Sequence, residues 1–180
     1  MNLFITQEGE VTINIRFLSS KYDVRDLLPN DAEMIYSVLK DNGIFYKYHP
    51  PMVTVQSILE DMEALPPNKC HDHKHYIGFF QETTLVAVMD LVEHYPHQGT
   101  ALLGFFAMNS RFQGKGVGTA IISDCIAHLT QSGFKKVRLG MDKGNPQSKA
   151  FWLKNDFAFT GEEYESDGST ILVMERISSE

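Results

Sequence analysis

Residues 113–119 of this chain, with the sequence QGKGVGT, have the composition of a loop that could hold a pyrophosphate. Gly114, Gly116 and Gly118 stand at alternate positions, so backbone N–H groups can approach a ligand without a Cβ between them. A helical pattern begins at Thr119, and the N-terminus of a helix offers unsatisfied N–H donors and the positive end of its dipole to an anion. The stretch therefore predicts a site for a phosphate-bearing cofactor.

Other types of glycine loop fit the spacing less well. A dinucleotide-binding GxGxxG loop requires a glycine where this chain has Thr119, and a Walker A loop requires Lys-Ser or Lys-Thr where it has Lys115-Gly116. Two alternatives stay open. The stretch could be a tight turn that leads into an amphipathic helix, or the protein could use it to bind ATP or GTP.

A carboxylate inside an apolar strand could accept a proton in a reaction. Asp90 lies within the run VAVMDLV at residues 86–92, where burial should raise the pKa of its carboxyl group toward the range of a general base. The alternative is an ion pair between Asp90 and a buried arginine or lysine. Glu93, His94 and Tyr95 follow at the end of the strand, and any of them could serve instead.

The stretch CHDHKH at residues 70–75 contains several potential metal ligands. Structural zinc sites usually take their ligands from two separated segments, and this stretch has no evident partner segment. We therefore interpret it as a polar loop before a strand and predict no metal site.

Composition limits the class of protein. The chain has 180 residues, 43% of them hydrophobic and 22% charged, which suits one globular domain. A formal charge of -7 argues against nucleic acid as the main partner, because nucleic-acid binders concentrate basic residues. With only Cys70 and Cys125, and no signal-peptide pattern in residues 1–15, we expect a cytoplasmic protein. No apolar run is long enough for a membrane span, so we expect no membrane partner.

The order of the predicted elements indicates an α+β fold with a mixed sheet. Apolar patterns and turn residues predict strands at 11–18, 22–28, 76–80, 85–92, 101–108 and 136–141, and a closing hairpin of 157–159 with 171–174. Helices are predicted after Asn30 or Asp31, after Thr54, over 119–129 and after Asn145. A loop rich in aromatic residues, 45–51, separates the first two helices.

With this order of elements, the chain resembles the GNAT superfamily of N-acetyltransferases from about residue 20 onward. Residues 113–118 match the family's Q/RxxGxG/A loop, Met108 ends the preceding strand, and the later helix start at 145–152 bears an asparagine. The resemblance implies an α/β/α layered fold with a mixed, mostly antiparallel sheet of six to seven strands, about four helices and splayed central strands. Residues 1–20 would be an N-terminal extension or an added strand, and residues 21–180 a single acetyltransferase domain.

The resemblance also implies acetyl-CoA as the cofactor. In the family, the strand before the loop leaves its main chain free for the pantetheine arm, and a backbone N–H near Phe106 polarises the thioester carbonyl. The implied cofactor-binding residues are Phe106, Ala107, Met108, Gln113, Gly114, Lys115, Gly116, Val117, Gly118, Thr119, Asn145, Ser148, Phe151 and Trp152. The aromatic loop borders the acceptor site in relatives, which indicates Tyr46, Tyr48 and His49 as substrate-binding residues.

Three positions depart from the family pattern. Trp152 stands where many relatives carry a tyrosine that protonates the departing thiolate, and an indole N–H cannot do this. Leu102 and Gly104 stand where some relatives carry an ionisable base. These departures leave a non-catalytic sensor of acyl-CoA as the alternative function.

The activity implied is direct transfer of an acetyl group to a primary amine of a small molecule or a peptide, by a monomer or homodimer. Cys125 lies in mid-helix at least two turns from the loop, so we interpret it as a core residue and not as a nucleophile. The catalytic candidates are therefore Asp90, Glu93, Tyr95 and the backbone N–H of Phe106.

Overall fold

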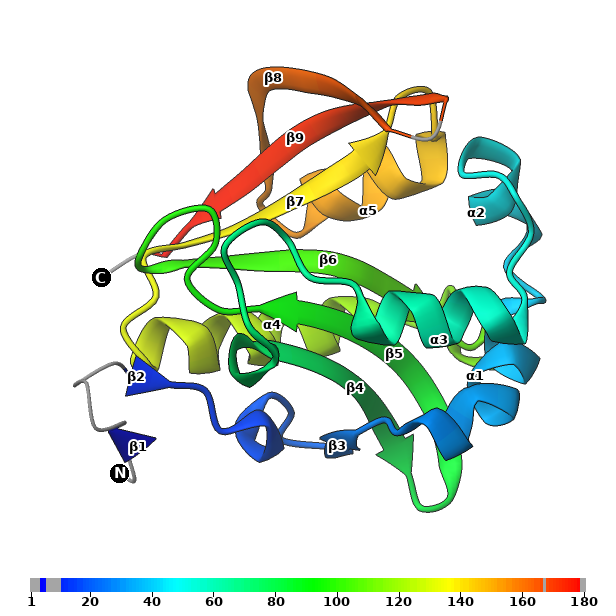
Figure 1. Cartoon of the computed structure of the whole chain (residues 1–180), viewed down its shortest axis with the longest axis horizontal. Helices are drawn as coiled ribbons and strands as arrows, with labels where there is room; N and C mark the ends of the chain where they lie inside the picture. Colours follow the sequence, from blue (N-terminus) through cyan, green and yellow to red (C-terminus); the bar gives the residue numbers. More distant parts are fainter. Residues whose placement is uncertain (1–3, 6–10, 167, 179–180) are drawn as a thin grey trace.

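A mixed sheet of seven strands forms the centre of the protein in the computed structural model, which describes residues 4–5, 11–166 and 168–178 (Figure 1). Its strands are β3 (Asp23–Asp26), β4 (Lys74–Gln81), β5 (Thr84–Val92), β6 (Thr100–Met108), β7 (Lys136–Asp142), β8 (Ala158–Ser166) and β9 (Ser169–Ile177). The strand order is β3-β4-β5-β6-β7-β9-β8, and within it only β6 and β7 run parallel. A separate pair consists of β1 (Phe4–Ile5) and β2 (Val11–Thr12). The predicted fold class is confirmed.

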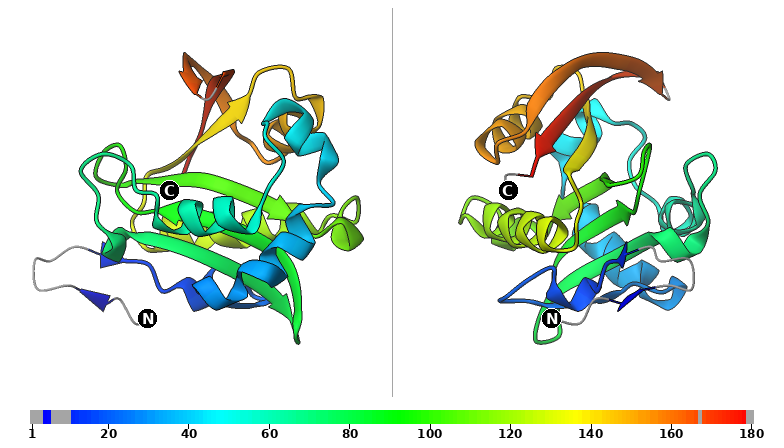
Figure 2. Two further views of the ribbon diagram at one scale, coloured as in Figure 1. Left: turned by 45° about the vertical axis from the view of Figure 1, so that its right-hand side comes forward. Right: turned by 90° about the vertical axis from the view of Figure 1, so that its left-hand side faces the viewer.

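The described residues form five α-helices: α1 (Ala32–Leu39), α2 (Gly43–Tyr48), α3 (Val55–Glu63), α4 (Val117–Gln131) and α5 (Pro146–Lys154). α4 and α5 cover one face of the sheet, and α1 and α3 cover the other (Figure 2). α2 stands near the end of β7 (Figure 1). Within the described part of the chain, none of these helices combines the length and the apolar character of a membrane span.

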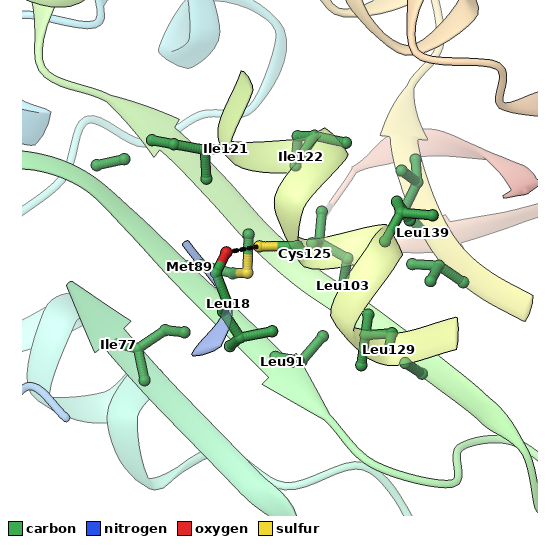
Figure 3. Close-up of a cluster of buried hydrophobic side chains, with 14 of the residues drawn as sticks. Leu18, Ile77, Met89, Leu91, Leu103, Ile121, Ile122, Cys125, Leu129 and Leu139 are labelled. Carbon is green, nitrogen blue, oxygen red and sulfur yellow. Dashed lines mark hydrogen bonds between the residues drawn. The ribbon is translucent and has the colours of Figure 1, made fainter. Parts of the chain in front are cut away.

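α4 packs on the sheet through one apolar face (Figure 3). Ile121, Ile122, Cys125 and Leu129 follow the helical period and are almost fully buried. The Cys125 Sγ donates a hydrogen bond of 3.3 Å to the carbonyl of Leu18, and burial raises the pKa of this thiol. The expected core position of Cys125 therefore agrees with its surroundings.

β6 and β7 separate half-way along β6. Their parallel register ends at the pair Leu103–Leu139. The next residue, Gly104, is an extra residue opposite β5, which makes a β-bulge and bends β6. Beyond the bulge β6 stays paired with β5 as far as Met108, whereas β7 diverges (Figure 1). The predicted splay of the central strands is confirmed.

Two predictions of local structure are wrong. The strand predicted at 11–18 ends at Thr12, because the Asn14 side chain accepts a hydrogen bond from the Arg16 N–H (3.2 Å) and begins a 3₁₀ turn. The segment predicted as an aromatic loop, 45–51, contains most of α2. Tyr46 is buried and Phe45 is partly buried in the core under α1 and α3, and this tertiary packing decides a conformation that local propensity leaves open.

The N-terminal extension predicted at residues 1–20 lies partly outside the described residues. In its described part, Ile13 and Leu18 are buried in the same core as α4. The backbone N–H of Ile13 donates to the carboxylate of Glu93 at the end of β5 (3.1 Å). Residues 13–18 therefore pack against the sheet.

Replacement of Ile122 by alanine tests the packing of α4. Ile122 is 1% exposed, whereas Ile177 at the end of β9 is 75% exposed. The lost methyl groups and the cavity left behind should lower the free energy of unfolding by about 2–5 kcal/mol. Urea denaturation measures this loss, with Ile177→Ala as the matched control, for which we expect a change within about 0.5 kcal/mol. Equal losses in the two variants would contradict the assigned core.

Candidate functional site

The glycine loop connects β6 to α4, as the sequence predicts. Gly114 and Gly116 have left-handed φ values of 71° and 77°, and a Cβ on either would meet nothing within 4 Å. Glycine is required there by backbone conformation and not by crowding. Gly118 differs, because it is buried and its Cβ would lie 3.2 Å from Phe151 Cε2. This third glycine allows α4 and α5 to approach each other.

A groove of about 310 Å³ lies between the end of β6, the glycine loop and α5. It is lined by Asn42, Phe45, Phe106, Ala107, Met108, Phe112, Gln113, Gly114, Gly116, Gly118, Thr119, Asn145, Gln147, Ser148, Phe151, Trp152 and Lys154. Most of the predicted cofactor-binding residues meet here. Val117 and Lys115 do not line the groove, and the Lys115 Nζ donates to the carbonyl of Arg111 (2.8 Å).

A second hollow, of about 520 Å³, lies between α5 and the β8–β9 hairpin. Two of its lining residues, Lys143 and Glu163, form an ion pair of 3.0 Å across it. It contains neither the glycine loop nor the unpaired end of β6. The groove is therefore the stronger candidate for a cofactor site.

The end of β6 presents unpaired main chain to the groove. The Met108 carbonyl accepts hydrogen bonds from Asn42 Nδ2 (3.2 Å) and Gln113 Nε2 (3.1 Å), so it points away from β5. Main-chain groups alternate in direction along an antiparallel strand, so the N–H and C=O of Phe106 point the same way as those of Met108. β7 has diverged at this level. The Phe106 main chain is therefore available to a ligand.

The start of α5 and a set of aromatic rings form the opposite wall of the groove. The Asn145 side chain is buried and accepts a hydrogen bond from the Ser148 N–H (3.0 Å), which caps α5. The Phe151 ring lies 6.0 Å from the Phe106 ring and 4.8 Å from the Trp152 ring, measured between centroids. Trp152 is almost fully buried and anchors this wall in the core.

Asp90 lies on the sheet face that carries α1 and α3. Its Oδ2 is 2.8 Å from the Nζ of Lys74, and the two side chains are 15% and 4% exposed. Burial raises the pKa of the Asp90 carboxyl group, while the Lys74 ammonium opposes the shift. The ion pair with a buried lysine, left open by the sequence, describes this geometry. Among the described residues, the buried Oδ1 of Asp90 has no hydrogen-bond partner.

Glu93 and Tyr95 lie at the opposite end of β5 from the groove. Glu93 is fully buried, and its Oε1 lies 2.6 Å from the Nε2 of His75. The Tyr95 N–H donates to the carbonyl of Thr100 (2.9 Å) in the turn between β5 and β6. Neither residue lines the groove.

α2 links the diverging strands at the mouth of the groove. The Phe45 ring packs edge-on against the Phe105 ring of β6, with 5.6 Å between the centroids. One turn later, the His49 Nδ1 lies 2.9 Å from the Asp142 Oδ1 of β7. The helix therefore contacts both strands where they no longer contact each other.

The two predicted tyrosines of this segment have different surroundings. Tyr46 is buried against the sheet, and burial raises the pKa of its phenol to about 12. Tyr48 is half-buried, and its carbonyl accepts a hydrogen bond from the Ser169 Oγ of β9 (3.3 Å). Tyr46 thus supports the position of α2, while Tyr48 lies nearer the surface.

The stretch at residues 70–75 forms a 3₁₀ turn, His71–His73, followed by the start of β4. Across the part of the chain that the structure describes, no group of three or more His, Cys, Asp or Glu residues could hold a metal ion.

Comparison with known proteins identifies the family. The sequence model of the Acetyltransferase (GNAT) family matches residues 34–157, which include the glycine loop, β6 and α5. The chain belongs to the GNAT acetyltransferase family. A search of curated proteins gave no match.

Solved structures share the fold of this GNAT acetyltransferase at low sequence identity. An acetyltransferase from Thermus thermophilus has a TM-score of 0.70 and 20% identity, over 87% of this chain and 97% of its own. The PaiA N-acetyltransferase from Thermoplasma acidophilum, solved with coenzyme A, has a TM-score of 0.61 and 18% identity, over 86% and 98%. A spermidine N-acetyltransferase chimera from Vibrio cholerae and hSSAT has 0.65 and 18%, over 88% and 96%. At these identities the likeness establishes the fold alone.

Two groove residues of the GNAT acetyltransferase, Asn42 and Phe45, are not among the site residues that the sequence predicts. Phe45 is predicted only as part of the aromatic loop at 45–51. Asp142 lies 93 positions from its partner His49 in the sequence, so no local sequence pattern predicts the pair. The Asn-Gly dipeptide directly before an aromatic segment is the one signal that could have indicated Asn42.

Loss of the Asp90 carboxylate tests the buried ion pair. Asp90→Asn leaves the Lys74 ammonium buried without a counter-charge, which should lower the free energy of unfolding by about 3–5 kcal/mol. The double variant Asp90→Asn/Lys74→Met should recover most of this loss, and urea denaturation of the four proteins in the cycle measures both effects. Additive losses in the double variant would show that the two groups are not coupled.

Proposed function

We propose that this GNAT acetyltransferase moves an acetyl group from acetyl-CoA to a primary amine of a small molecule or a peptide, by direct transfer. The observation that carries the proposal is the unpaired main chain of Phe106, which faces the same groove as the glycine loop. The cytoplasm is the proposed location, because Cys70 and Cys125 are both free thiols and a reducing compartment preserves them.

Different parts of the groove suit the pyrophosphate and the pantetheine arm of acetyl-CoA. The pyrophosphate binds at the start of α4, where the left-handed loop and Thr119 border the groove and the helix N-terminus favours an anion. The pantetheine arm follows the main chain of β6 from Met108 to Phe106, in the place that β7 leaves open. Asn145 and the rings of Phe151 and Trp152 enclose it from the side of α5.

The protein's own groups account for two parts of the chemistry. Acetyl-CoA supplies an activated acyl group, and the Phe106 N–H donates to the carbonyl oxygen of that group, where negative charge develops. Trp152 cannot protonate the departing thiolate, but a thiol with a pKa of about 8.5 can leave unprotonated near neutral pH. Cys125 is buried in the core and cannot serve as a nucleophile.

The acceptor approaches from the sheet face that carries α1 and α3. Gly104 of β6 and Gly140 of β7 directly follow the last paired residues of the two strands. A Cβ on Gly104 would lie 3.0 Å from Asp90 Oδ2, and one on Gly140 would lie 2.7 Å from Ile171 Cγ2 and 3.0 Å from the Tyr164 hydroxyl. The two glycines thus bring the β6 and β7 backbones close to a carboxylate and a hydroxyl on the face that we assign to the acceptor. The spermidine N-acetyltransferase among the structural neighbours supports an amine as the acceptor.

Among the residues predicted for catalysis and acceptor binding, Asp90 lies beside Gly104, and His49 contacts Asp142, two residues beyond Gly140 on β7. Tyr46 and Tyr48 stay in the proposal as residues of α2 that border the acceptor site. Glu93 and Tyr95 stay as candidates for proton transfer at the far end of β5, with less support from their positions.

A non-catalytic acyl-CoA sensor is the second candidate function. It is favoured by Trp152, Leu102 and Gly104, which provide no ionisable group at the positions expected from the family. Release of free CoA, measured with a panel of small amines and peptide N-termini, separates the two functions. Binding of acetyl-CoA without release on any amine would support the sensor.

Thr119→Glu should abolish cofactor binding without harming the fold. A carboxylate in the first turn of α4 stabilises the helix but repels the pyrophosphate. In a thermal-shift assay, acetyl-CoA at 100 times its Kd should stabilise the parent by about 2.7 kcal/mol and the variant hardly at all. Ser123→Glu, which adds the same charge on the exposed side of α4, is the matched control and should respond like the parent. Stabilisation of the parent by ATP but not by CoA would contradict the proposal.

Gly104→Val should separate acceptor access from cofactor binding. The new side chain stands against Asp90 on the face that we assign to the acceptor, so we expect at least a tenfold lower kcat/KM for the amine, equivalent to about 1.4 kcal/mol or more. The Kd for acetyl-CoA should stay within twofold, because Gly104 does not line the groove. Unchanged turnover in a folded variant would remove this face from the acceptor route.

A further inference from the structure

We propose that His49 is a catalytic residue that accepts the proton of the acceptor amine, and that Asp142 is the positioning residue that orients it. The assignment rests on the proposed function and names a group that the family pattern does not supply at Leu102, Gly104 or Trp152. It is carried by the geometry of one histidine–aspartate pair at the mouth of the groove.

The pair fixes which nitrogen of His49 is open. The Nδ1 lies 2.9 Å from Asp142 Oδ1, and a carboxylate can only accept, so Nδ1 carries the hydrogen. In the neutral ring, Nε2 therefore bears the lone pair. The Asp142 side chain is 8% exposed, whereas that of His49 is 44% exposed. The described residues include no hydrogen-bond partner for Nε2, so the basic nitrogen is available to a substrate.

The His49 ring lies between the cofactor groove and the face of the sheet that we assign to the acceptor. Phe45, one turn before His49, lines the cofactor groove, and the two rings lie 5.2 Å apart between centroids. Asp142 lies two residues beyond Gly140 on β7, so the two positions share the face of the sheet that we assign to the acceptor. His49 is thus one side-chain layer from the groove and in contact with the strand that carries Gly140.

Charged and titratable groups surround the pair on several elements. Asp142 faces the ring from β7, and Asp61 of α3 interacts with it electrostatically. Tyr164 of β8 interacts with Asp142. Lys47 and Tyr48 precede His49 on its own helix. The two carboxylates stabilise the positive charge that the ring acquires when it takes a proton.

The step balances without a further reactant. The lone pair of the neutral amine forms the new C–N bond, and the C–S bond breaks with its electron pair on sulfur. One amine proton passes to Nε2 of His49, and Asp142 compensates the charge of the imidazolium through Nδ1–H. The proton is then released to water. Asp90 is less suited to this step, because one of its oxygens is held by Lys74.

The test compares His49→Gln, Asp142→Asn and a control in steady-state acetylation of an amine that the parent accepts. General-base catalysis typically contributes about 100-fold or more, so we expect kcat to fall at least 100-fold in His49→Gln. The acidic limb of the pH–rate profile should disappear in that variant, and added imidazole should partly restore His49→Ala. Asp142→Asn keeps an acceptor for Nδ1–H but loses the charge, and it should lower kcat at least tenfold.

Three readouts decide between this role and a structural one. His71→Gln is the matched control, because His71 is 62% exposed and lies 3.7 Å from Glu63, and its kcat should not change. The Kd for acetyl-CoA should stay within twofold in all variants. An acidic limb that persists in His49→Gln, or a loss confined to KM, would overturn the assignment and leave the acetyltransferase proposal intact. A parent protein that binds acetyl-CoA but acetylates no amine would overturn both.

Discussion

The architecture of the site depends on one broken ladder of hydrogen bonds. β6 and β7 are paired only as far as Leu103 and Leu139, so the end of β6 has a strand on one side and none on the other. Main-chain groups inside a protein require partners, and an unpaired edge at the centre of a sheet is costly. Asn42 and Gln113 satisfy the Met108 carbonyl with side-chain amides. Phe106 is left for a ligand, and the glycine loop and α5 are placed around that length of main chain.

Where β6 is no longer paired with β7, its side chains pack into a different core on each face of the sheet. Phe106 and Met108 pack with the core of α4 and α5, and that side forms the groove. Phe105 and Ala107 pack with the core of α1 and α3, on the side that we propose for the acceptor. In the proposed function, the alternation of side chains along one short strand therefore separates the donor from the acceptor.

Much of this arrangement was predictable from the sequence, and the rest was not for physical reasons. The glycine loop, the succession of most strands and helices along the chain and the cap at Asn145 depend on local patterns, so the sequence predicts them. α2 was missed because a six-residue helix is held by tertiary packing of its aromatic rings and not by intrinsic propensity. The partners of Asp90 and His49 depend on strand register and on the path of a distant segment. A single sequence shows which charged and titratable residues the chain contains, but not which of them are in contact.

The broken ladder has a mechanical consequence. β3 to β6 form one plate and β7 to β9 form another, joined by a seam that runs only from Thr100 to Leu103 on β6. Such a short paired region can act as a hinge between the two parts of the sheet. α2 contacts both parts, through Phe45 and His49. A ligand bound along Phe106, as we propose for acetyl-CoA, would supply hydrogen-bond partners where β7 no longer does. The sheet would then be stiffer and more continuous than the chain alone can make it.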